Sequence, residues 1–329
     1  MLEHGGNLRE AAEQFNRPLS DWLDLSTGLN PHGYPAPPIG AAAWHRLPEK
    51  DLALVQAASR YYGAPHLLAV AGSQAAIQAL PRLRAPSRVA VAAPSYAEHA
   101  HHWKQHGHST REVPHALLGQ AVPDCDVMVV CNPNNPTGHV VPREQLLSWR
   151  AQLAQRGGWL VVDEAFADVA PADSVADVAG LPGLIVLCSV GKFFGLAGLR
   201  VGFVGAAPPL LDELDSLLGP WTVSGPAQLV ARAALDDLAW QEQTRERLAS
   251  SHARLGAILR ECGLDASGTA LFQWWPMDDP EPMWRHLAER GIWTRLFRQG
   301  ARGIRVGVPP DELGWQKLIT ALNEWKNRS

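Results

Sequence analysis

The 329-residue sequence lacks several features that would place it in a common class. It has no apolar run near the roughly 20 residues of a membrane span, and residues 1–6 lack the charged and apolar regions of a signal peptide. No block of Lys and Arg occurs, and 29 basic against 33 acidic residues give a net charge of −4. A membrane or a nucleic acid is therefore not an expected partner, and we expect a cytoplasmic protein.

Cysteine is also scarce. The four cysteines are scattered, and three of them lie in or beside apolar runs: Cys125, Cys131, Cys188 and Cys262. Buried thiols in a reducing compartment explain this pattern better than disulfides or a zinc site. The G-x-S-x-G elbow of serine hydrolases is missing as well, which argues against that class of enzyme.

What is present is an alternation of short apolar runs and longer helical patterns. The runs cover 67–71, 88–93, 126–131, 159–162, 184–190 and 201–205, and helices are predicted from about 73, over 96–106 and over 142–155. This pattern predicts an α/β fold with a mostly parallel sheet that helices cover on both faces. Ligands of such sheets bind beyond the carboxyl ends of the strands. The residues at or just past such ends are Ser73, Tyr96, Asn135, Asp163 and Lys192.

The pattern of apolar runs and helices changes after Gly219-Pro220. Long helical patterns cover about 227–262, strands are predicted near 271–275 and 302–308, and helices near 281–290 and 311–325. We therefore expect a large domain over residues 41–220 and a smaller α/β domain over 221–329. The proline-rich stretch 31–38 reads as an extended connector, and we expect residues 1–40 to pack with the smaller domain.

One lysine stands in a loop of small residues directly after an apolar run. Lys192 follows the run ending at Val190, and Arg200 opens the next one. A lysine at the end of a buried strand is costly unless it is paired or used chemically. With Ser189 and Arg200 it suits a lysine that forms an imine with an aldehyde cofactor whose phosphate the serine and the arginine hold.

Two nucleotide-binding motifs do not fit this loop. A phosphate-binding nucleotide loop would need glycine at 186 and Ser or Thr at 193, where the chain has Val186 and Phe193. A dinucleotide fingerprint fails because the G-x-G core is missing. When this stretch is considered alone, a surface lysine in a glycine loop remains an alternative interpretation of Lys192.

Two further loops follow predicted strands. Residues 132–138 read Asn-Pro-Asn-Asn-Pro-Thr-Gly, which suits either a structural turn or a binding loop. Asp163 ends a strand, where a carboxylate can pair with a protonated pyridine nitrogen or simply cap the strand. Gly72-Ser73-Gln74 favours a phosphate but equally an ordinary helix cap, and Tyr96 can stack on a planar ring or be half-buried.

Histidines and arginines complete the candidates. His99, His102 and His106 share one face of a predicted helix, and without a carboxylate or cysteine at ligand spacing we interpret them as a polar face. No metal is therefore expected. Arg295 and Arg305 flank strands of the last domain and suggest a substrate with two anionic groups, with surface arginines as the alternative.

Taken together, the motifs at 132–138, 163–166 (Asp-Glu-Ala-Phe) and 189–200 (Ser-x-x-Lys-x7-Arg) resemble the pyridoxal-phosphate enzymes of the aspartate aminotransferase fold. The resemblance runs over nearly the whole chain. It implies that Lys192 forms the imine and that Asp163 meets the pyridine nitrogen. It assigns the phenolic oxygen of the cofactor, and contact with the substrate, to Asn135. The residues that it implies around the phosphate and the ring are Ser73, Gln74, Ser189, Arg200 and Tyr96.

Two branches fit best, histidinol-phosphate aminotransferase and L-threonine-O-3-phosphate decarboxylase of cobalamin synthesis. Residues 4–10 and 23–31 are similar to the opening of the decarboxylases, and Phe166 stands where the aminotransferases usually have tyrosine. The resemblance implies that Arg305 binds the α-carboxylate. It places Arg295 and His4 at the substrate phosphate.

Two residues depart from the family pattern. Leu47 replaces the tyrosine that usually reaches the active site of a neighbouring subunit, and Gly28 replaces an asparagine common in the decarboxylases as a substrate contact. The resemblance implies a homodimer that decarboxylates L-threonine O-3-phosphate to (R)-1-amino-2-propanol O-2-phosphate. A histidinol-phosphate-type aminotransferase is the alternative, because the same residues can remove the α proton. A pyridoxal-phosphate-binding regulator without catalysis is a remote one.

Overall fold

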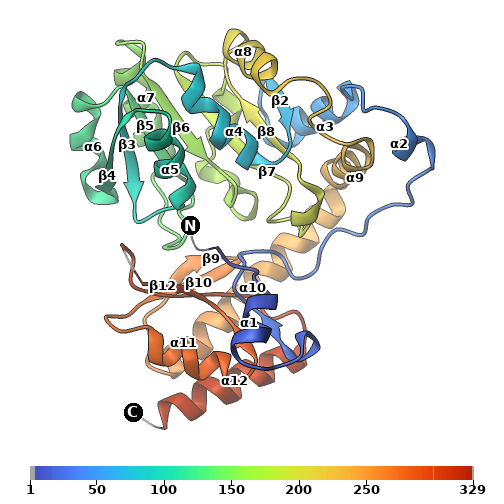
Figure 1. The fold of residues 1–329 in the computed structure, drawn as a ribbon, viewed down its shortest axis with the longest axis vertical. Helices are drawn as coiled ribbons and strands as arrows, with labels where there is room; N and C mark the ends of the chain where they lie inside the picture. The colour runs from blue at the N-terminus through green and yellow to red at the C-terminus, as the bar shows by residue number, and fades with distance from the viewer. Residues whose placement is uncertain (1–3, 299, 328–329) are drawn as a thin grey trace. The chain divides into compact units, whose positions relative to one another are not determined.

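The structure, a computed structural model, describes residues 4–298 and 300–327 and forms two compact units (Figure 1). The central unit comprises Gly33–Asn135 and His139–Glu242. The terminal unit comprises the chain up to His32, the short piece Pro136–Gly138 and the chain from Gln243 onward.

The central unit is built on one seven-stranded sheet in the order β2-β8-β7-β6-β5-β3-β4. Its strands are β2 (Leu67–Val70), β3 (Arg88–Ala93), β4 (Ser109–Pro114), β5 (Val127–Cys131), β6 (Trp159–Asp163), β7 (Leu184–Ser189) and β8 (Gly202–Gly205). The strands from β4 to β7 are parallel, and only β8 runs antiparallel to its neighbours. The predicted mostly parallel sheet is thus confirmed.

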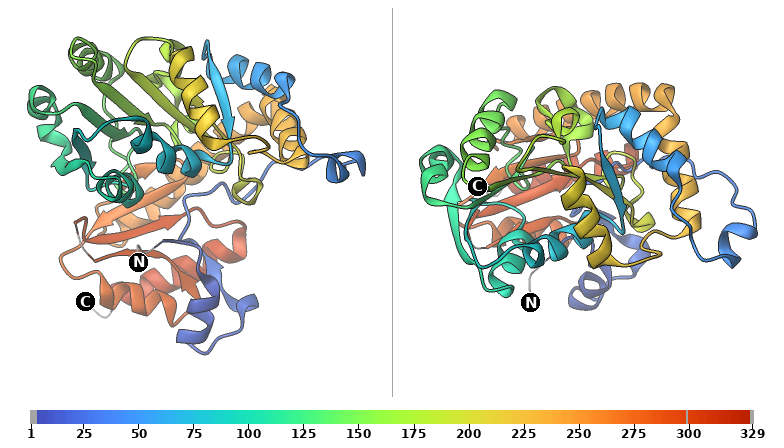
Figure 2. Two further views of the ribbon diagram at one scale, coloured as in Figure 1. Left: turned by 45° about the horizontal axis from the view of Figure 1, so that its top comes forward. Right: turned by 90° about the horizontal axis from the view of Figure 1, so that it is seen from above.

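Helices cover both faces of this sheet. The helices of the central unit are α2 (Ala42–His45), α3 (Leu52–Tyr62), α4 (Ser73–Ala79), α5 (Ala97–Gln105), α6 (Leu118–Ala121), α7 (Arg143–Ala154), α8 (Pro208–Leu218) and α9 (Gly225–Asp236), of which α2 lies away from the sheet and contacts α9 (Figure 1). α4, α5 and α8 pack on one face, and α7 lies on the opposite face (Figure 2). Local chemistry sets the ends of α3, where the Asp51 side chain accepts from the Ala53 amide and Gly63 takes the left-handed conformation.

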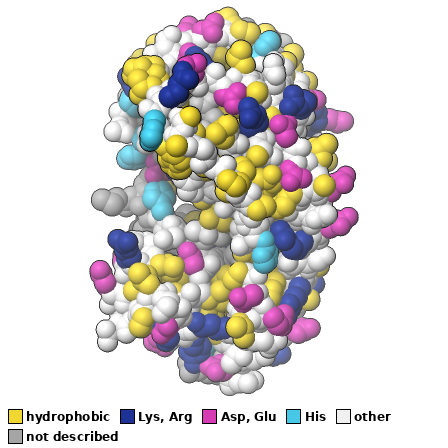
Figure 3. Space-filling view, turned by 90° about the vertical axis from the view of Figure 1, so that its right-hand side faces the viewer, with side chains coloured by type: hydrophobic (Ala, Val, Ile, Leu, Met, Phe, Trp, Pro, Cys, Tyr) yellow, Lys and Arg dark blue, Asp and Glu magenta, His cyan; other side chains and the backbone are white. Residues whose placement is uncertain are grey.

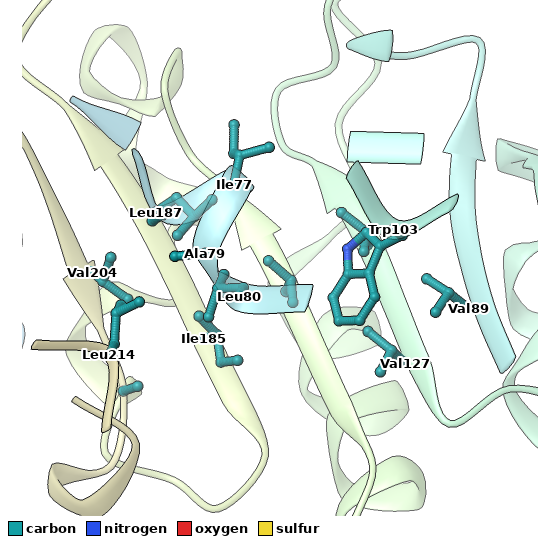
Figure 4. Packing of buried hydrophobic residues seen from close by; sticks show 14 of the residues in the cluster. Ile77, Ala79, Leu80, Val89, Trp103, Val127, Ile185, Leu187, Val204 and Leu214 are labelled. Carbon is teal, nitrogen blue, oxygen red and sulfur yellow. The ribbon is translucent and has the colours of Figure 1, made fainter. Parts of the chain in front are cut away.

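The core between these layers is continuous and almost entirely aliphatic. Trp103 of α5 lies over Val89 and Val127, while Ile77 and Leu80 cover the strands beside them (Figure 4). Full burial of each such side chain contributes about 1.5–3 kcal/mol. This packing holds the carboxyl ends of the strands in a fixed row.

The terminal unit contains two small sheets and three helices of its own. β1 (Leu23–Asp24) pairs with β11 (Ile292–Trp293), and a four-stranded sheet has the order β12-β13-β10-β9. The remaining elements are α1 (Leu8–Gln14), β9 (Ser267–Thr269), β10 (Phe272–Pro276), α11 (Glu281–Ala288), β12 (Arg295–Phe297), β13 (Gly303–Gly307) and α12 (Glu312–Lys326). α10 (Leu238–Glu261) begins in the central unit and continues into the terminal one.

Aromatic side chains join the N-terminal segment to the rest of the terminal unit. Phe15 packs edge-on against Trp22, Trp284 and Trp293, with ring centroids 5.8, 5.9 and 6.3 Å away. The segment around α1 therefore belongs to the same core as α11, although these elements lie at opposite ends of the sequence.

The units end at different residues from those expected for the domains. The domain boundaries expected at 40 and 220 stay predictions, whereas the compact units change at 32 and 242. Gly33 lies against the main chain of Gly195, and α9 packs on α3, where the Asp51 amide donates to Gln228. Gly219 and Pro220 lie within the compact central unit.

Some elements escaped the sequence pattern. β4 was not predicted, because an edge strand with exposed Arg111 and Glu112 lacks an apolar run. The helical patterns over 227–262 are two helices that meet at Asp237, whose carboxylate accepts from the Trp240 amide.

The distribution of charged side chains on the surface and the burial of the cysteines agree with the composition. On the face drawn in Figure 3, basic and acidic side chains are interspersed, in keeping with the small net charge. Cys125, Cys131 and Cys188 are buried and Cys262 is partly exposed, all as free thiols. None of the helices in residues 4–298 and 300–327 is long and apolar enough to cross a membrane.

Candidate functional site

The carboxyl ends of β5, β6 and β7 place three predicted residues along one edge of the central sheet. Cys131 pairs with Asp163 across β5 and β6, and Asp163 pairs with Leu187 on β7. Asn135 follows β5, Asp163 ends β6, and Lys192 follows β7. Because neighbouring parallel strands end at the same edge, these residues lie on the side of the sheet where ligands bind.

Asp163 is 5% exposed and is held from two sides. One carboxylate oxygen accepts from the Ala165 amide at 3.0 Å, and the other lies 2.9 Å from Nε2 of His99. Burial alone lowers the pKa of His99, but the neighbouring Cys131 and the bond to Asp163 outweigh it and raise the pKa to about 10. The groups around His99 therefore favour its protonated form beside the Asp163 carboxylate.

This pair corrects the interpretation of the three histidines as one polar helix face. His99 is buried, His102 contacts Glu98, and His106 lies beyond the end of α5. The nearest ligand-type atoms of His99, Cys131 and Asp163 lie within 4.8 Å of one another. Spacing along the helix could not reveal this, because the cysteine and the carboxylate come from two strands of the sheet.

A second group of polar residues surrounds the start of α4. Gly72 has φ of +76°, and a Cβ there would lie 2.7 Å from Nη2 of Arg200, so glycine lets the guanidinium approach the main chain. A Cβ on Gly202 would lie 2.7 Å from the Ser73 amide, and Gly202 pairs with Ser189. A guanidinium and two serines thus converge, and this donor set suits a phosphate.

Arg200 itself adopts the left-handed conformation, with φ of +55°. A non-glycine residue there costs on the order of 1 kcal/mol. Its side chain donates to the Ala197 carbonyl at 3.3 Å and stays exposed. The strained backbone turns this guanidinium back toward Gly72 instead of along β8.

Gln74 and Tyr96 are joined by a hydrogen bond. The Tyr96 hydroxyl donates to Oε1 of Gln74 at 3.2 Å, and both side chains are half-buried. Tyr96 directly precedes α5, and Gln74 is the second residue of α4. The structure therefore brings together two residues that the sequence analysis selected for different parts of a cofactor.

Aromatic packing fixes the loop that carries Lys192. Phe194 stacks on Trp240 with ring centroids 5.7 Å apart and planes at 10°, and its carbonyl accepts from the Tyr34 amide at 2.8 Å. Lys192 is half-buried, and its Nζ lies 5.5 Å from the ring centroid of Phe166. The amine is thus presented from a rigid loop rather than from a mobile surface turn.

The loop that carries Asn135 is also held by its own asparagines. Asn132 makes two hydrogen bonds to the main chain of Val141, at 3.1 and 2.8 Å. The Asn134 amide group donates to the Pro94 carbonyl at 2.9 Å. Asn132 and Asn134 are buried, whereas Asn135 is half-buried. The first two asparagines therefore shape the loop, and the third has the exposure that a ligand contact requires.

Glu164, the neighbour of Asp163, holds a loop in place through its hydrogen bonds. Its carboxylate accepts from the Ser174 hydroxyl at 2.5 Å and from the Val175 amide at 2.7 Å. Burial raises its pKa to about 7, against the effect of these two hydrogen bonds. The adjacent acids therefore differ, because Glu164 anchors a loop and Asp163 lies at the edge of the sheet.

In the terminal unit, Arg295 and Arg305 stand directly opposite each other on β12 and β13. Arg305 is 6% exposed and donates to the Ser26 carbonyl at 2.7 Å. Burial, followed by the charge of Arg295, lowers its pKa to about 9. Like charges opposite each other destabilise an antiparallel pair, so this arrangement suits an anion.

The N-terminal segment lies beside these arginines within the same unit. Arg295 approaches the His4 carbonyl at 3.5 Å, and the Gly6 amide donates to Ser26 Oγ at 2.7 Å. The His4 residue is exposed and Gly28 is buried. The structure thus groups His4, Ser26, Arg295 and Arg305, although 279 positions separate the last from Ser26.

Comparison with known proteins places the chain in a family. The sequence profile of the family "Aminotransferase class I and II" matches residues 43–311. The chain is 53% identical over 329 residues to a threonine-phosphate decarboxylase of Pseudomonas aeruginosa, covering 99% of this chain and 98% of that protein. It is 41% identical over 330 residues to a threonine-phosphate decarboxylase of a Sinorhizobium species, covering 98% and 97%.

The fold also matches solved structures. Histidinol-phosphate aminotransferase from Sinorhizobium meliloti in complex with pyridoxal-5'-phosphate superposes with a TM-score of 0.82 at 22% identity, covering 100% of this chain and 96% of that one. At this identity the likeness concerns the fold alone. The family profile and the full-length relatives together lead to one conclusion: this chain belongs to the class I and II aminotransferase family.

Proposed function

We propose that this chain is a pyridoxal-phosphate-dependent decarboxylase that converts L-threonine O-3-phosphate to (R)-1-amino-2-propanol O-2-phosphate and carbon dioxide. The observation that carries the proposal is the similarity, over the whole chain, to two threonine-phosphate decarboxylases. The substrate bears a carboxylate and a phosphate, and the terminal unit offers two cross-strand arginines.

The residues of the central unit fit pyridoxal phosphate. The fit rests on the approach of Arg200 to Gly72, which a side chain at that position would block, and on the buried Asp163 carboxylate. The residues that would hold the cofactor are Ser73, Gln74, Ser189 and Arg200 at the phosphate, Tyr96 at the ring face, Asn135 at the phenolic oxygen and Asp163 at the ring nitrogen. When bound, pyridoxal phosphate supplies a ring that takes up the electron pair left on the α carbon as the carboxylate departs.

Lys192 and Asp163 would be the catalytic residues. Lys192 would attach the cofactor through its amine and later carry the proton to the α carbon of the substrate. Asp163 would keep its negative charge beside the ring nitrogen and so hold a proton there. His99 fixes the orientation of that carboxylate by the bond at 2.9 Å.

Arg305 and Arg295 would orient the substrate by its two anionic ends. Arg305 would bind the α-carboxylate in a bidentate fork, and Arg295, with His4, would bind the phosphate. Asn135 would contact the substrate beside the ring. Gly28 offers only its main chain, so the side-chain contact expected from the family pattern is missing here.

The test is to incubate the purified protein with pyridoxal phosphate and L-threonine O-3-phosphate and to measure released carbon dioxide and the amino alcohol phosphate. Stoichiometric carbon dioxide with catalytic turnover supports the proposal. Keto acid and pyridoxamine phosphate without carbon dioxide would identify an aminotransferase instead. A bound chromophore without any turnover would identify a regulator, and histidinol phosphate with 2-oxoglutarate serves as the comparison substrate pair.

We also propose that the protein is a homodimer of the cytoplasm that acts in cobalamin biosynthesis. Large apolar side chains are exposed on one region of the central unit: Trp44, Leu47, Leu52 and Trp221 are 63, 65, 72 and 59% exposed. A second copy of the chain would cover them, which size-exclusion chromatography with light scattering tests. Leu47 cannot make the hydrogen bond that the family's tyrosine offers a neighbouring subunit.

A further inference from the structure

Glu98 is a buried acidic residue that the proposed chemistry does not use. It is the second residue of α5 and is 9% exposed. One of its oxygens, Oε2, accepts from Nε2 of Gln74 at 2.8 Å and lies 2.9 Å from Nε2 of His102. A carboxylate in this position is costly unless its hydrogen bonds are made, so the contacts of Glu98 determine what it does.

The carboxylate determines how the Gln74 amide is oriented. An ionised carboxylate only accepts hydrogen bonds, so Gln74 must turn its NH2 group toward Glu98. Its carbonyl oxygen then points the other way, where it accepts from the Tyr96 hydroxyl at 3.2 Å. A neutral acceptor at position 98 could keep this orientation, whereas an apolar residue would leave the amide free to flip.

Tyr96 is affected through the same chain of hydrogen bonds. Burial, followed by the charges of Glu98 and Asp163, raises the pKa of the Tyr96 hydroxyl, which therefore stays protonated and can donate. Its hydrogen is directed to Gln74. The ring of Tyr96 is thus fixed at its hydroxyl end, which limits rotation of the face that a planar ring would stack on.

His102 holds the outer end of the network. It lies one helical turn after Glu98, and its other ring nitrogen, Nδ1, is 3.1 Å from Oε1 of Gln105. The Glu98 and His102 side chains are each 12% exposed. The network therefore runs from Tyr96 and Gln74 through Glu98 to His102, within the central unit throughout.

We propose that Glu98, backed by His102, is a positioning residue that holds Gln74 and Tyr96 in the orientation in which they grip pyridoxal phosphate. This inference rests on the proposed function, because Gln74 and Tyr96 are the cofactor contacts proposed above. Glu98 itself touches neither cofactor nor substrate in this proposal. Its role is to remove the alternative amide orientation before the cofactor binds.

The experiment measures the affinity of the cofactor-free protein for pyridoxal phosphate, by fluorescence titration, in Glu98→Ala, Glu98→Gln and His102→Ala. We expect Glu98→Ala to raise the apparent Kd about tenfold, the loss typical of one hydrogen bond to a charged group. Glu98→Gln should stay within about threefold of wild type, because its carbonyl still accepts from Gln74. His102→Ala should fall between them.

Lys104→Ala is the matched control. Lys104 lies on the same helix and forms an exposed ion pair with Glu112 at 3.0 Å, away from the network. It should bind the cofactor like wild type. Visible circular dichroism of the bound cofactor gives a second readout, since a loosened Tyr96 and Gln74 should weaken the band in Glu98→Ala and leave it unchanged in Lys104→Ala.

A double-mutant cycle decides whether Glu98 acts through Gln74. In a Gln74→Leu background, Glu98→Ala should produce no further loss of affinity. An affinity of Glu98→Ala equal to wild type, or an undiminished loss in the Gln74→Leu background, overturns the inference. If Glu98→Ala does not fold, the ranking of Glu98→Gln and His102→Ala carries the test. Failure of the wild-type protein to bind pyridoxal phosphate would refute the proposed function instead.

Discussion

Asp163 of the central unit and Arg305 of the terminal unit are both buried, but the two units compensate these charges differently. In the central unit Asp163 is 5% exposed and faces His99 at 2.9 Å. In the terminal unit Arg305 is 6% exposed, donates to a backbone carbonyl, and stands opposite another arginine. The central unit thus supplies the opposite charge itself, whereas the terminal unit concentrates positive charge.

The pKa values of His99 and Arg305 differ in the same way. The environment of His99 raises its pKa to about 10, so the ion pair with Asp163 is favoured. The environment of Arg305 lowers its pKa to about 9, through burial and the charge of Arg295. An anion bound beside Arg305 would reverse that effect. The central unit therefore pairs its buried charge without a ligand, whereas in the terminal unit the dianionic substrate proposed above would relieve the unfavourable electrostatics around Arg305.

Removal of the Lys192 amine is expected to have the largest effect. Lys192→Ala should lower decarboxylation by at least about 10³-fold, since both cofactor attachment and proton delivery are lost. Visible absorbance of the attached cofactor should disappear, while substrate anions still have both arginines of the terminal unit. Lys50→Ala, which removes an exposed lysine of the central unit, is the control. A normal visible spectrum in Lys192→Ala would contradict the assignment.

Removal of the two buried charges should change the free energy of unfolding by different amounts in the two units. Asp163→Ala leaves His99 buried without its carboxylate and should cost about 3–5 kcal/mol in the free energy of unfolding. Arg305→Met removes the buried charge together with its desolvation cost and should change stability by less than about 1 kcal/mol. Denaturant unfolding of the cofactor-free variants measures both, and equal losses would break the comparison. Arg305→Met should nevertheless lose affinity for the substrate.

The smallest effect concerns pH. In the proposed function the charged guanidinium of Arg305 would bind the carboxylate. Burial and the charge of Arg295 lower the pKa of Arg305 to about 9, so affinity for the substrate should be constant below that pH and KM should rise as pH increases through it. Arg295→Ala removes the charge that helps to lower this pKa and should move the break upward. Because the substrate amine titrates in the same range, the shift between the two proteins is the quantity to measure, and an unchanged break would refute the coupling.

Much of the central site was accessible from the sequence. Apolar strands that end in polar residues predict a row of side chains at one edge of a parallel sheet, and Asn135, Asp163 and Lys192 follow the ends of β5, β6 and β7 there. The prediction succeeded because strand and loop patterns are local. The roles assigned to these residues stay predictions until the variants above are measured.

Other features were invisible in the sequence. The spacing of His99, His102 and His106 predicts a polar helix face, yet the partners of His99 come from the ends of β5 and β6. No sequence motif marks Glu98, because its contact is a hydrogen bond from Gln74 on another helix. Contacts between distant segments produce no periodic pattern in the sequence. Each of these side chains, taken alone, is of a type that is common on protein surfaces.

The α/β class, the strand ends that carry Asn135, Asp163 and Lys192, and the family resemblance follow from the amino-acid sequence, since these depend on local periodicity and motif order. Which charges are compensated depends on the packing of the folded chain. It brought His99 to Asp163, Glu98 to Gln74, and Arg295 to Arg305. The physical reason is that the free energy of a buried charge depends on the groups packed around it, and packing brings those groups together from distant parts of the chain.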